Sequence, residues 1–379
     1  MPSKPMKLLF VFGTRPEAIK LAPLVREFKN RKDAEVKVCV TAQHRQMLDQ
    51  VLEFFDIVPD YDLNIMKPNQ TLFDVTADGL KALEKVLEDF QPEIVFVQGD
   101  TTTSFIGALA AYYKKIKVAH IEAGLRSGNK YSPFPEEINR ILAGHIANYH
   151  FPPTQQSVEN LNRENIHEHV YNVGNTVIDA LFLGLKLVKA RGEKHYSKMF
   201  DGINLLRKIV LITGHRRESF GEPFENICAA IKTVASQFPD VEFVYPVHLN
   251  PNVQEPVNRL LSGLSNVHLI TPLDYPHFIW IMEKSYVVLT DSGGLQEEAP
   301  ALGKPVLVMR EVTERQEGVD AGTAKLVGTD QDVIVRELMT LLLDESAYQK
   351  MARAVNPYGD GTACKQIADI ILNVKKGVA

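Results

Sequence analysis

The chain has 379 residues, too many for one domain of ordinary size and well suited to two. Its hydrophobic content of 45% and charged content of 23% are typical of a globular enzyme. A net charge of −5 gives no electrostatic basis for binding nucleic acid or an anionic membrane. The three cysteines are scattered, as expected for reduced thiols, and no apolar run is long enough for a signal peptide or a membrane span. We therefore expect a cytoplasmic enzyme with no nucleic-acid or membrane partner.

The first half of the chain alternates short apolar runs with segments of helical periodicity. Strands are predicted at residues 7–12, 36–40, 93–97 and 118–121, and helices at 16–28, 71–90, 104–113 and 136–141. Two further short strands are predicted at 149–152 and 170–174. This βαβα alternation predicts a parallel, doubly wound sheet.

The charged segment 191–204 lacks a clear period and is interpreted as part of the connection to a second domain. The alternation then restarts, with strands predicted at 208–213, 241–247, 267–270, 287–290 and 305–309, and with a helix that contains Phe278. A turn cluster at 356–361 precedes a final helix. The pattern predicts an α/β protein in which two domains repeat one architecture.

The junction after the predicted strand 287–290 has the features of a phosphate-binding turn. Ser292 is the predicted N-cap of the next helix, and Gly293 and Gly294 allow a ligand to approach the backbone closely. Unpaired N–H groups at such a helix start favour a phosphate, and Glu298, one turn later, could reach the hydroxyls of a ribose. The alternative is an ordinary strand–helix connection.

Polar residues gather at or just past the C-terminal ends of the predicted strands. These residues are Arg15, Asp100, Glu122, His215, His248 and Asp291. Ligands bind at that edge of open α/β sheets, and two such domains are expected to turn both edges toward one interdomain cleft. One charged residue at a strand end is usually a cap or a solvated loop residue, but six drawn from both halves favour a shared site.

The sequence also argues against several cofactors. It contains no G-x-G-x-x-G motif, and Gly303-Lys304 is followed by Pro305 rather than by Ser or Thr, so neither NAD nor a Walker-type ATP site is expected. Residues 330–332 (Asp-Gln-Asp) begin an amphipathic helix, where acidic residues complement the helix dipole. Residues 167–169 (His-Glu-His) are interpreted as a solvated loop, and we therefore predict no metal site.

The remaining candidates are a nucleotide at the 292–298 turn and three carboxylates in the first half, Asp100, Glu122 and Glu136. Glu136 and Arg140 are four residues apart on one helix face, so they could alternatively form only a local surface ion pair. The position of Glu136 directly after a Pro-rich turn favours a role in the site.

Several long motifs occur together in one order, at residues 12–20, 41–45, 99–103, 122–126, 132–137, 214–218, 291–300 and 356–359. With these motifs, nearly the whole chain resembles the non-hydrolysing UDP-N-acetylglucosamine 2-epimerases. The resemblance implies two Rossmann-like, doubly wound domains in a GT-B arrangement with an interdomain cleft. It places the N-terminal domain at 1–172, the C-terminal domain at 173–358, and a helix that crosses back at 359–379. It also implies a homodimer that uses no metal or other cofactor.

The resemblance further implies a reaction and a set of residues. The family interconverts UDP-N-acetylglucosamine and UDP-N-acetylmannosamine by eliminating UDP to form 2-acetamidoglucal and then adding UDP back. Its essential groups correspond to Asp100, Glu122, Glu136 and His215, without settling which carboxylate serves which face of C2. Arg15 and Arg140 would contact phosphate or sugar, and Lys20 would support the acids. The diphosphate would lie at Ser292, Gly293 and Gly294 and the ribose at Glu298, whereas Phe278 would contact uracil or serve as a core aromatic.

The chain departs from the family at two points. Gln316 stands where the family usually has Pro, which predicts a looser loop around Arg315. Some members bind a second UDP-N-acetylglucosamine as an activator, beside residues that match Gln43, Gln46, Arg216, Glu218 and His248, but an arginine of those members corresponds to Asn69 here. A hydrolysing epimerase, a glycosyltransferase of the same fold and a nucleotide-sugar sensor are the alternative functions.

Overall fold

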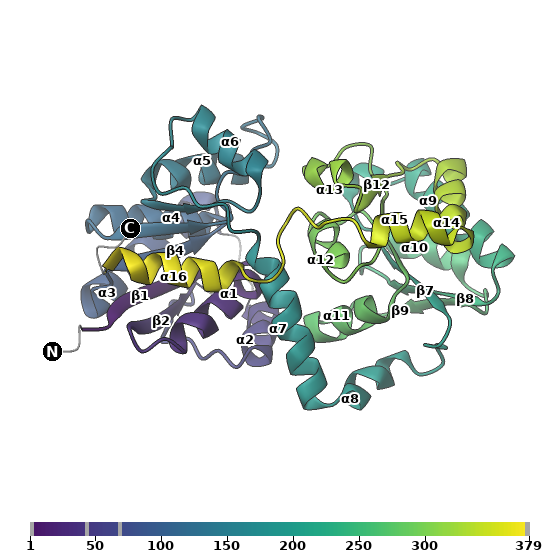
Figure 1. Cartoon of the computed structure of the whole chain (residues 1–379), viewed down its shortest axis with the longest axis horizontal. Coiled ribbons are helices and arrows are strands. Elements are labelled where there is room, and N and C mark those ends of the chain that lie inside the picture. Colours follow the sequence, from purple (N-terminus) through teal and green to yellow (C-terminus); the bar gives the residue numbers. More distant parts are fainter. Residues whose placement is uncertain (1–3, 42–44, 67–69, 376–379) are drawn as a thin grey trace. The chain divides into compact units, whose positions relative to one another are not determined.

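The protein is described here by a computed structural model that covers residues 4–41, 45–66 and 70–375. The chain forms two compact units (Figure 1). Unit 1 comprises residues 1–183 and 358–379, and unit 2 comprises residues 184–357. The first change of unit therefore falls between residues 183 and 184, whereas the sequence analysis put it at 172/173. The C-terminal helix belongs with unit 1.

Unit 1 contains one parallel sheet of the order β3-β2-β1-β4-β5-β6. Its strands are β1 (Met6–Phe12), β2 (Ala34–Val40), β3 (Tyr61–Asp62), β4 (Ile94–Gln98), β5 (Lys117–Ile121) and β6 (Tyr149–Phe151). Its helices are α1 (Arg15–Lys29), α2 (Arg45–Phe54), α3 (Leu72–Phe90), α4 (Thr102–Tyr113), α5 (Glu136–Ile146), α6 (Gln155–Arg163) and α16 (Ala363–Lys375), and α7 (Thr176–Arg191) carries the chain into unit 2.

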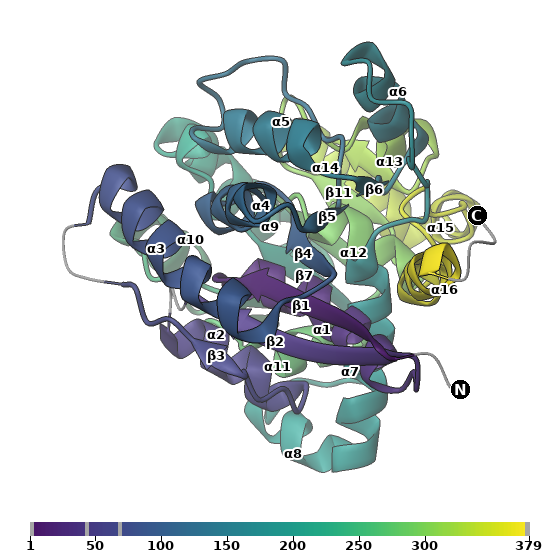
Figure 2. The same ribbon diagram turned by 90° about the vertical axis from the view of Figure 1, so that its left-hand side faces the viewer.

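The apolar runs of unit 1 become central strands because both of their faces are covered by helices. Helices α3, α4 and α5 pack side by side on one face, and α16 lies against α1 on the other (Figure 2). Between sheet and helices, Phe10 of β1 stacks on Phe96 of β4 at 4.5 Å between ring centroids, and Phe28 of α1 packs on both rings. These rings are fully buried, so they anchor the central pair of strands.

Unit 2 repeats this plan, with the sheet order β12-β11-β10-β7-β8-β9. Its strands are β7 (Lys208–Thr213), β8 (Val241–Pro246), β9 (Val267–Ile270), β10 (Val287–Thr290), β11 (Val306–Val308) and β12 (Ala324–Leu326). Its helices are α8 (Glu193–Ser197), α9 (Glu222–Gln237), α10 (Pro251–Leu261), α11 (Tyr275–Lys284), α12 (Leu295–Ala301), α13 (Gln316–Asp320), α14 (Gln331–Leu343) and α15 (Glu345–Ala352), with 3₁₀ turns η1 (Lys198–Phe200) and η2 (Arg217–Ser219). Helix α9 packs between α10 and α14 over a continuous apolar core.

Both sheets have the strand order of the doubly wound dinucleotide-binding fold, which confirms the predicted α/β class with two Rossmann-like domains. In such a sheet, the chain leaves two adjacent central strands toward opposite sides, and the crevice between the two exits receives ligands. These exits follow β1 and β4 in unit 1 and β7 and β10 in unit 2. The fold alone therefore singles out the turns at 13–15, 99–101, 214–216 and 291–294.

Two local predictions were wrong. Residues 170–174 form no strand but only an isolated bridge between Val170 and His150, which extends the sheet edge beyond β6 by a single pairing. The segment 191–204 is not patternless, because it contains α8 and η1, whose Tyr196 and Phe200 are buried and pack on the α11 residues His277 and Trp280.

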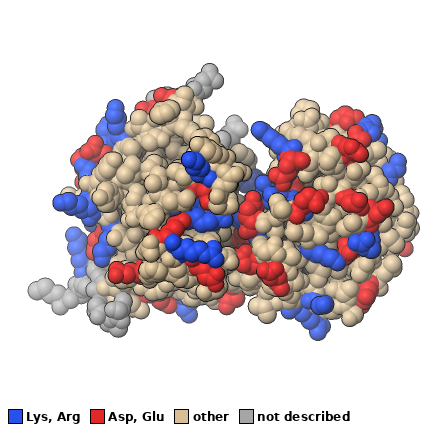
Figure 3. Space-filling view, turned by 90° about the horizontal axis from the view of Figure 1, so that it is seen from above, with Lys and Arg blue, Asp and Glu red and all other residues tan. Residues whose placement is uncertain are grey.

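The surface carries charges of both signs. Lysine and arginine side chains alternate with aspartate and glutamate over the face drawn in Figure 3, in agreement with the small net charge. Within the ranges that the structure describes, no helix combines the length and the apolar character that crossing a membrane requires.

Candidate active site

In unit 1, the buried carboxylate of Glu17 connects the turn after β1 with the turn after β4. It lies in the first turn of α1 and accepts the backbone N–H groups of Gly13 and Thr14 at 3.0 and 2.8 Å. Its other oxygen accepts the hydroxyls of Thr101 and Ser104, which lie at the start of α4, at 2.6 and 3.0 Å. Burial raises the pKa of Glu17, although these hydrogen bonds act in the opposite direction. One side chain thus fixes the turns after β1 and β4 to each other.

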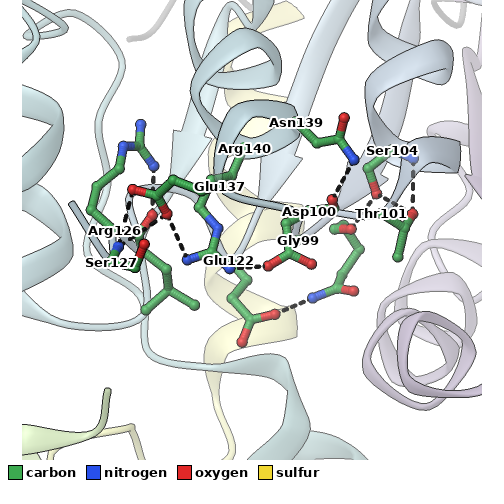
Figure 4. A network of polar contacts seen from close by, with 12 residues as sticks. Gly99, Asp100, Thr101, Ser104, Glu122, Arg126, Ser127, Glu137, Asn139 and Arg140 are labelled. Atoms are coloured by element: carbon green, nitrogen blue, oxygen red, sulfur yellow. Dashed lines mark hydrogen bonds and ion pairs between the residues drawn. The ribbon is translucent and has the colours of Figure 1, made fainter. Parts of the chain in front are cut away.

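Asp100 lies in the second of these turns and pairs with Arg140 of α5 (Figure 4). Asn139 also donates its side-chain amide to the Asp100 carbonyl at 3.0 Å. Arg140 additionally contacts Glu137 at 3.3 Å. The alternative of a local surface pair between Glu136 and Arg140 is therefore wrong, because the guanidinium reaches across the sheet edge to the Asp100 carboxylate.

His120 of β5 forms a hydrogen bond to the turn that carries Asp100. The buried imidazole donates its Nε2–H to the carbonyl of Gly99 at 2.7 Å. Burial lowers the pKa of His120 to about 4, so the ring is neutral at physiological pH and acts as a donor without adding charge. Gly99 itself has φ +66°, a conformation that glycine adopts without strain.

Glu122 is a second buried acid of unit 1 that several side chains hold. It follows β5 with φ +60°, in the left-handed region that non-glycine residues rarely occupy, and it is only 6% exposed. Lys20 of α1 donates to its Oε1 at 2.7 Å, Asn175 donates to the same oxygen at 3.0 Å, and the side-chain amide of Gln98 donates to Oε2. A buried, strained carboxylate held by three donors is characteristic of a functional position.

Glu136 and Glu137 begin α5 and have different surroundings. Glu137 is 2% exposed and accepts the backbone N–H groups of Ser127 and Gly128 at 3.0–3.1 Å, which fixes the loop that follows Glu122 and Arg126 (Figure 4). Glu136 is half-buried, and its carboxylate forms no hydrogen bond or ion pair with another described residue. Of the two, Glu136 has the carboxylate that other described side chains leave unoccupied, and its role in the site stays a prediction.

In unit 2, Asp291 organises the turn after β7. It is 2% exposed and accepts the backbone N–H groups of His215 and Arg216 at 2.6 and 2.7 Å, and its other oxygen lies 3.3 Å from Nδ1 of His215. Burial opposes ionisation, but the contacts with His215 and the two N–H groups outweigh it, so the pKa of Asp291 lies below its usual value. His248 stacks on His215 with the ring centroids 5.3 Å apart.

The turn after β10 differs from its prediction in one respect. Ser292 is not the N-cap of α12, because the chain continues through the two glycines and Gly294 occupies that position. The glycines do provide open backbone. A Cβ on Gly293 would lie 3.7 Å from the guanidinium carbon of Arg315 and 4.0 Å from Nη2 of Arg216, so two cations flank this turn. Arg315 is in turn held by the buried Glu297 at 2.7 Å.

The loop that lacks the family's proline is held by hydrogen bonds. Thr313 donates its hydroxyl to Gln296 at 2.7 Å and accepts the N–H of Arg315 at 3.1 Å. Gln316 takes the first position of α13 and bonds to Asp320 at 2.9 Å. Arg315 therefore has a defined place beside Gly293.

The other predicted residues are distributed as follows. Arg15 starts α1 and is half-buried, Phe278 is half-buried on α11, and Glu298 is 9% exposed with an oxygen 3.6 Å from a Cβ placed on Gly294. Glu218 pairs with Arg310 at 2.8 Å. Gln43 and Asn69 lie outside the described residues, as does the side chain of Gln46. Within the described ranges, no three His, Cys, Asp or Glu side chains are grouped as metal ligands would be.

Five residues that organise these turns were missed by the sequence analysis, namely Glu17, Gln98, Glu137, Asn175 and Glu297. All five are buried below 4% exposure, and Glu297 holds the arginine that flanks Gly293. Buried polar residues next to predicted strand ends were the available signal, since such groups need partners.

Comparison with known proteins identifies the family of this chain. A model of the family described as UDP-N-acetylglucosamine 2-epimerase matches residues 26–372. A UDP-N-acetylglucosamine 2-epimerase of Salmonella typhimurium is 56% identical over 365 residues, which cover 96% of this chain and 97% of the relative. The structure of the Neisseria meningitidis UDP-GlcNAc 2-epimerase bound to UDP-GlcNAc is 52% identical with a TM-score of 0.89, covering 97% of this chain and 100% of that one.

A more distant structure, the Methanocaldococcus jannaschii UDP-GlcNAc 2-epimerase in complex with UDP-GlcNAc and UDP, is 33% identical with a TM-score of 0.79. It covers 97% of this chain and 100% of its own. Sequence and fold therefore agree over almost the full length, and the family predicted from the motifs is confirmed. The chain belongs to the UDP-N-acetylglucosamine 2-epimerase family.

Proposed function

We propose that this member of the family is the non-hydrolysing kind, which interconverts UDP-N-acetylglucosamine and UDP-N-acetylmannosamine by eliminating UDP and adding it back. The observation that carries the proposal is the set of three carboxylates at one edge of the unit 1 sheet, Asp100, Glu122 and Glu136, of which the first two are held by ion pairs. A glycosyltransferase of the same fold needs one base, whereas proton exchange on two faces of a sugar carbon needs more groups.

The chemistry explains this requirement. The C2 proton of the sugar has no adjacent carbonyl and is not acidic. Cleavage of the C1–O bond gives C1 oxocarbenium character, and the C2 proton can then be removed to form 2-acetamidoglucal and UDP. Returning a proton to the opposite face of C2 and UDP to C1 gives the epimer, so atoms and charge balance without a cofactor. General acid–base help is typically worth about 10²–10⁴-fold for each group.

Two of the three acids are held in one orientation by neighbouring side chains, which suits proton transfer. Arg140 orients the Asp100 carboxylate through an ion pair. Lys20 does the same for Glu122, which its two amide partners also hold in one orientation. Glu136 has no such partner among the described side chains and sits on the rigid first turn of α5. We assign the two faces of C2 to Asp100 and to one of the two glutamates.

Unit 2 supplies the groups for UDP. The guanidiniums of Arg216 and Arg315 flank the open backbone of Gly293, a combination suited to a diphosphate. Glu298 beside Gly294 is assigned to the ribose. Asp291 orients His215 through Nδ1, so that His215 can protonate or stabilise the departing diphosphate. The UDP-GlcNAc bound to the Neisseria relative supports this substrate.

Activation by a second substrate molecule would involve Arg216, Glu218 and His248. Arg216 lies beside Gly293 and His248 stacks on His215, so a ligand that moved either side chain would act directly on the groups assigned to UDP. We therefore assign them a regulatory role in addition to substrate binding. Turnover of UDP-N-acetylmannosamine alone, without a lag and without added UDP-N-acetylglucosamine, would contradict that role.

We also assign the protein as a cytoplasmic homodimer that supplies N-acetylmannosamine units for a cell-surface polysaccharide. All three cysteines are free and buried, in keeping with a reducing compartment. Helices α3 and α4 present exposed aromatic side chains, with Phe73, Tyr112 and Tyr113 each more than 60% exposed, and such a face favours association. Sedimentation of the wild type against Tyr113→Glu tests the dimer, and a monomeric wild type would contradict it.

The reaction itself is tested by following ³¹P and ¹H signals of UDP-N-acetylglucosamine with the wild type and with Asp100→Asn, Glu122→Gln and Glu136→Gln. We expect UDP-N-acetylmannosamine with its diphosphate attached, and a loss of about 10²-fold or more in each variant. Glu159→Gln, an exposed glutamate of α6, is the matched control and should retain activity. Free N-acetylmannosamine and UDP would identify a hydrolysing epimerase instead.

A further inference from the structure

Asn175 lies where both connections between the units meet unit 1. It immediately precedes α7, which carries the chain out of unit 1, and its side-chain oxygen accepts the N–H of Val177 at 3.1 Å, as an N-cap does. Its own backbone N–H donates to the carbonyl of Tyr358 at 2.7 Å, and Tyr358 is the first residue after the chain returns to unit 1. One residue thus joins the departing and the returning segments.

The two segments cross at backbone contact. A Cβ on Gly174 would lie 3.1 Å from the Cα of Gly359, and a Cβ on Gly359 would lie 3.2 Å from the Cα of Gly174. Both glycines have positive φ, +86° and +113°. Asn175 is 2% exposed and Tyr358 is 3% exposed, whereas the two glycines are partly exposed.

The remaining group of Asn175, its side-chain N–H₂, points to the acid site. It donates to Oε1 of Glu122 at 3.0 Å, the same oxygen that Lys20 holds. The Asn175 amide therefore has two roles: its oxygen caps α7, and its nitrogen holds the Glu122 carboxylate. A residue that was only a helix cap would not need to face a buried carboxylate 53 positions earlier in the sequence.

We infer that Asn175 is a positioning residue for the epimerisation. Its side chain holds the Glu122 carboxylate in one orientation, and its backbone N–H bonds to the returning segment at Tyr358. The inference rests on the proposed role of Glu122. Because Glu122 is buried, loss of one donor leaves part of its charge without a partner, and hydrogen bonds to charged groups are among the stronger ones. Asn175 touches neither sugar nor nucleotide in this account and acts through Glu122 alone.

Two substitutions separate this role from helix capping. Asn175→Ser keeps an N-cap oxygen but loses the donor to Glu122. Asn175→Asp also keeps the cap and places a second carboxylate beside the first. We expect kcat to fall on the order of tenfold to a hundredfold in Asn175→Ser, with the KM for UDP-N-acetylglucosamine little changed. The acid limb of the kcat–pH profile should move to higher pH in Asn175→Ser and further in Asn175→Asp, because the charged form of Glu122 is destabilised.

The control is Asp330→Ser, which also exchanges an N-cap residue, at α14, and leaves the acid site untouched. It should match the wild type in kcat and in pH profile, and thermal unfolding of all three variants shows how much folded protein each assay contains. Asn175 variants that fold and turn over like the wild type, with an unmoved acid limb, would overturn the inference and leave the proposed function intact. A wild type that folds but does not epimerise UDP-N-acetylglucosamine would overturn both.

Discussion

Asp179 offers a prediction whose size follows from the structure. It lies on α7, 8% exposed, and its Oδ1 accepts the N–H of Cys364 at 2.9 Å, in the first turn of α16. Its Oδ2 is buried and has no hydrogen-bond partner among the described residues. Burial raises the pKa of this carboxyl from 3.8 to about 6, although the bonds from the α16 backbone act in the opposite direction. At neutral pH the folded protein therefore holds a buried charge that it stabilises poorly.

The shift corresponds to about 3 kcal/mol, since one pKa unit equals about 1.4 kcal/mol. Below pH 3.8 both the folded and the unfolded chain hold the proton, whereas between 3.8 and about 6 only the folded chain does. The folded state thus loses stability as the pH rises through this window, and the loss is complete above about pH 6. Asp179→Asn removes the titrating group and should be more stable than the wild type at pH 8, by up to about 3 kcal/mol.

Thermal unfolding followed by circular dichroism measures the difference. A gain of this size corresponds to an increase in Tm of up to about 10 °C at pH 8, and the difference should fall toward zero near pH 4. Asp330→Asn, which exchanges an exposed N-cap for another good one, is the control and should show a small difference that does not vary with pH. An Asp179→Asn variant no more stable than the wild type at pH 8, or a pH-independent gain, would refute the reasoning.

Two further substitutions test the site, and a third tests the crossing of the two connecting segments. Lys20→Met removes the cation beside the buried Glu122 and should reduce kcat by about 100-fold or more, whereas the exposed Lys29→Met should not; equal activities would contradict the assigned role. Arg315→Met should weaken UDP binding by about tenfold or more in calorimetry, and an unchanged Kd would remove Arg315 from the diphosphate site. The free energy of unfolding should be at least about 1 kcal/mol lower for Gly359→Ala than for Gly263→Ala, because both glycines have positive φ but only the first substitution adds a Cβ against another backbone. Equal losses of stability in the two variants would show that the crossing is not tight.

Much of the fold could be predicted because its strands are short apolar runs that end at polar turns. The strands from β1 to β11 were located within a few residues wherever a run was fully buried, as in 94–98. Helix α7 was missed because its apolar residues are spread around the helix rather than along one face. Residues 170–174 have strand-like composition, but they pair at one position only, which local sequence does not reveal.

For the site, the sequence predicted which turns lie together at the edge of each sheet. Strand ends identified Asp100, Glu122, His215 and Asp291, because parallel strands place these ends together. Their partners were not predictable, since Lys20 and Glu122 are 102 positions apart and no spacing rule links them. The N-cap was placed at Ser292 from its residue type, but Gly294 occupies that position.

The central claim, reversible epimerisation through loss of the C2 proton, is tested most directly by proton NMR of the wild type with UDP-N-acetylglucosamine in D₂O. The account predicts a mixture of UDP-N-acetylglucosamine and UDP-N-acetylmannosamine, both deuterated at C2 and both still carrying UDP. Epimerisation without deuterium at C2, or an unchanged substrate, would contradict it.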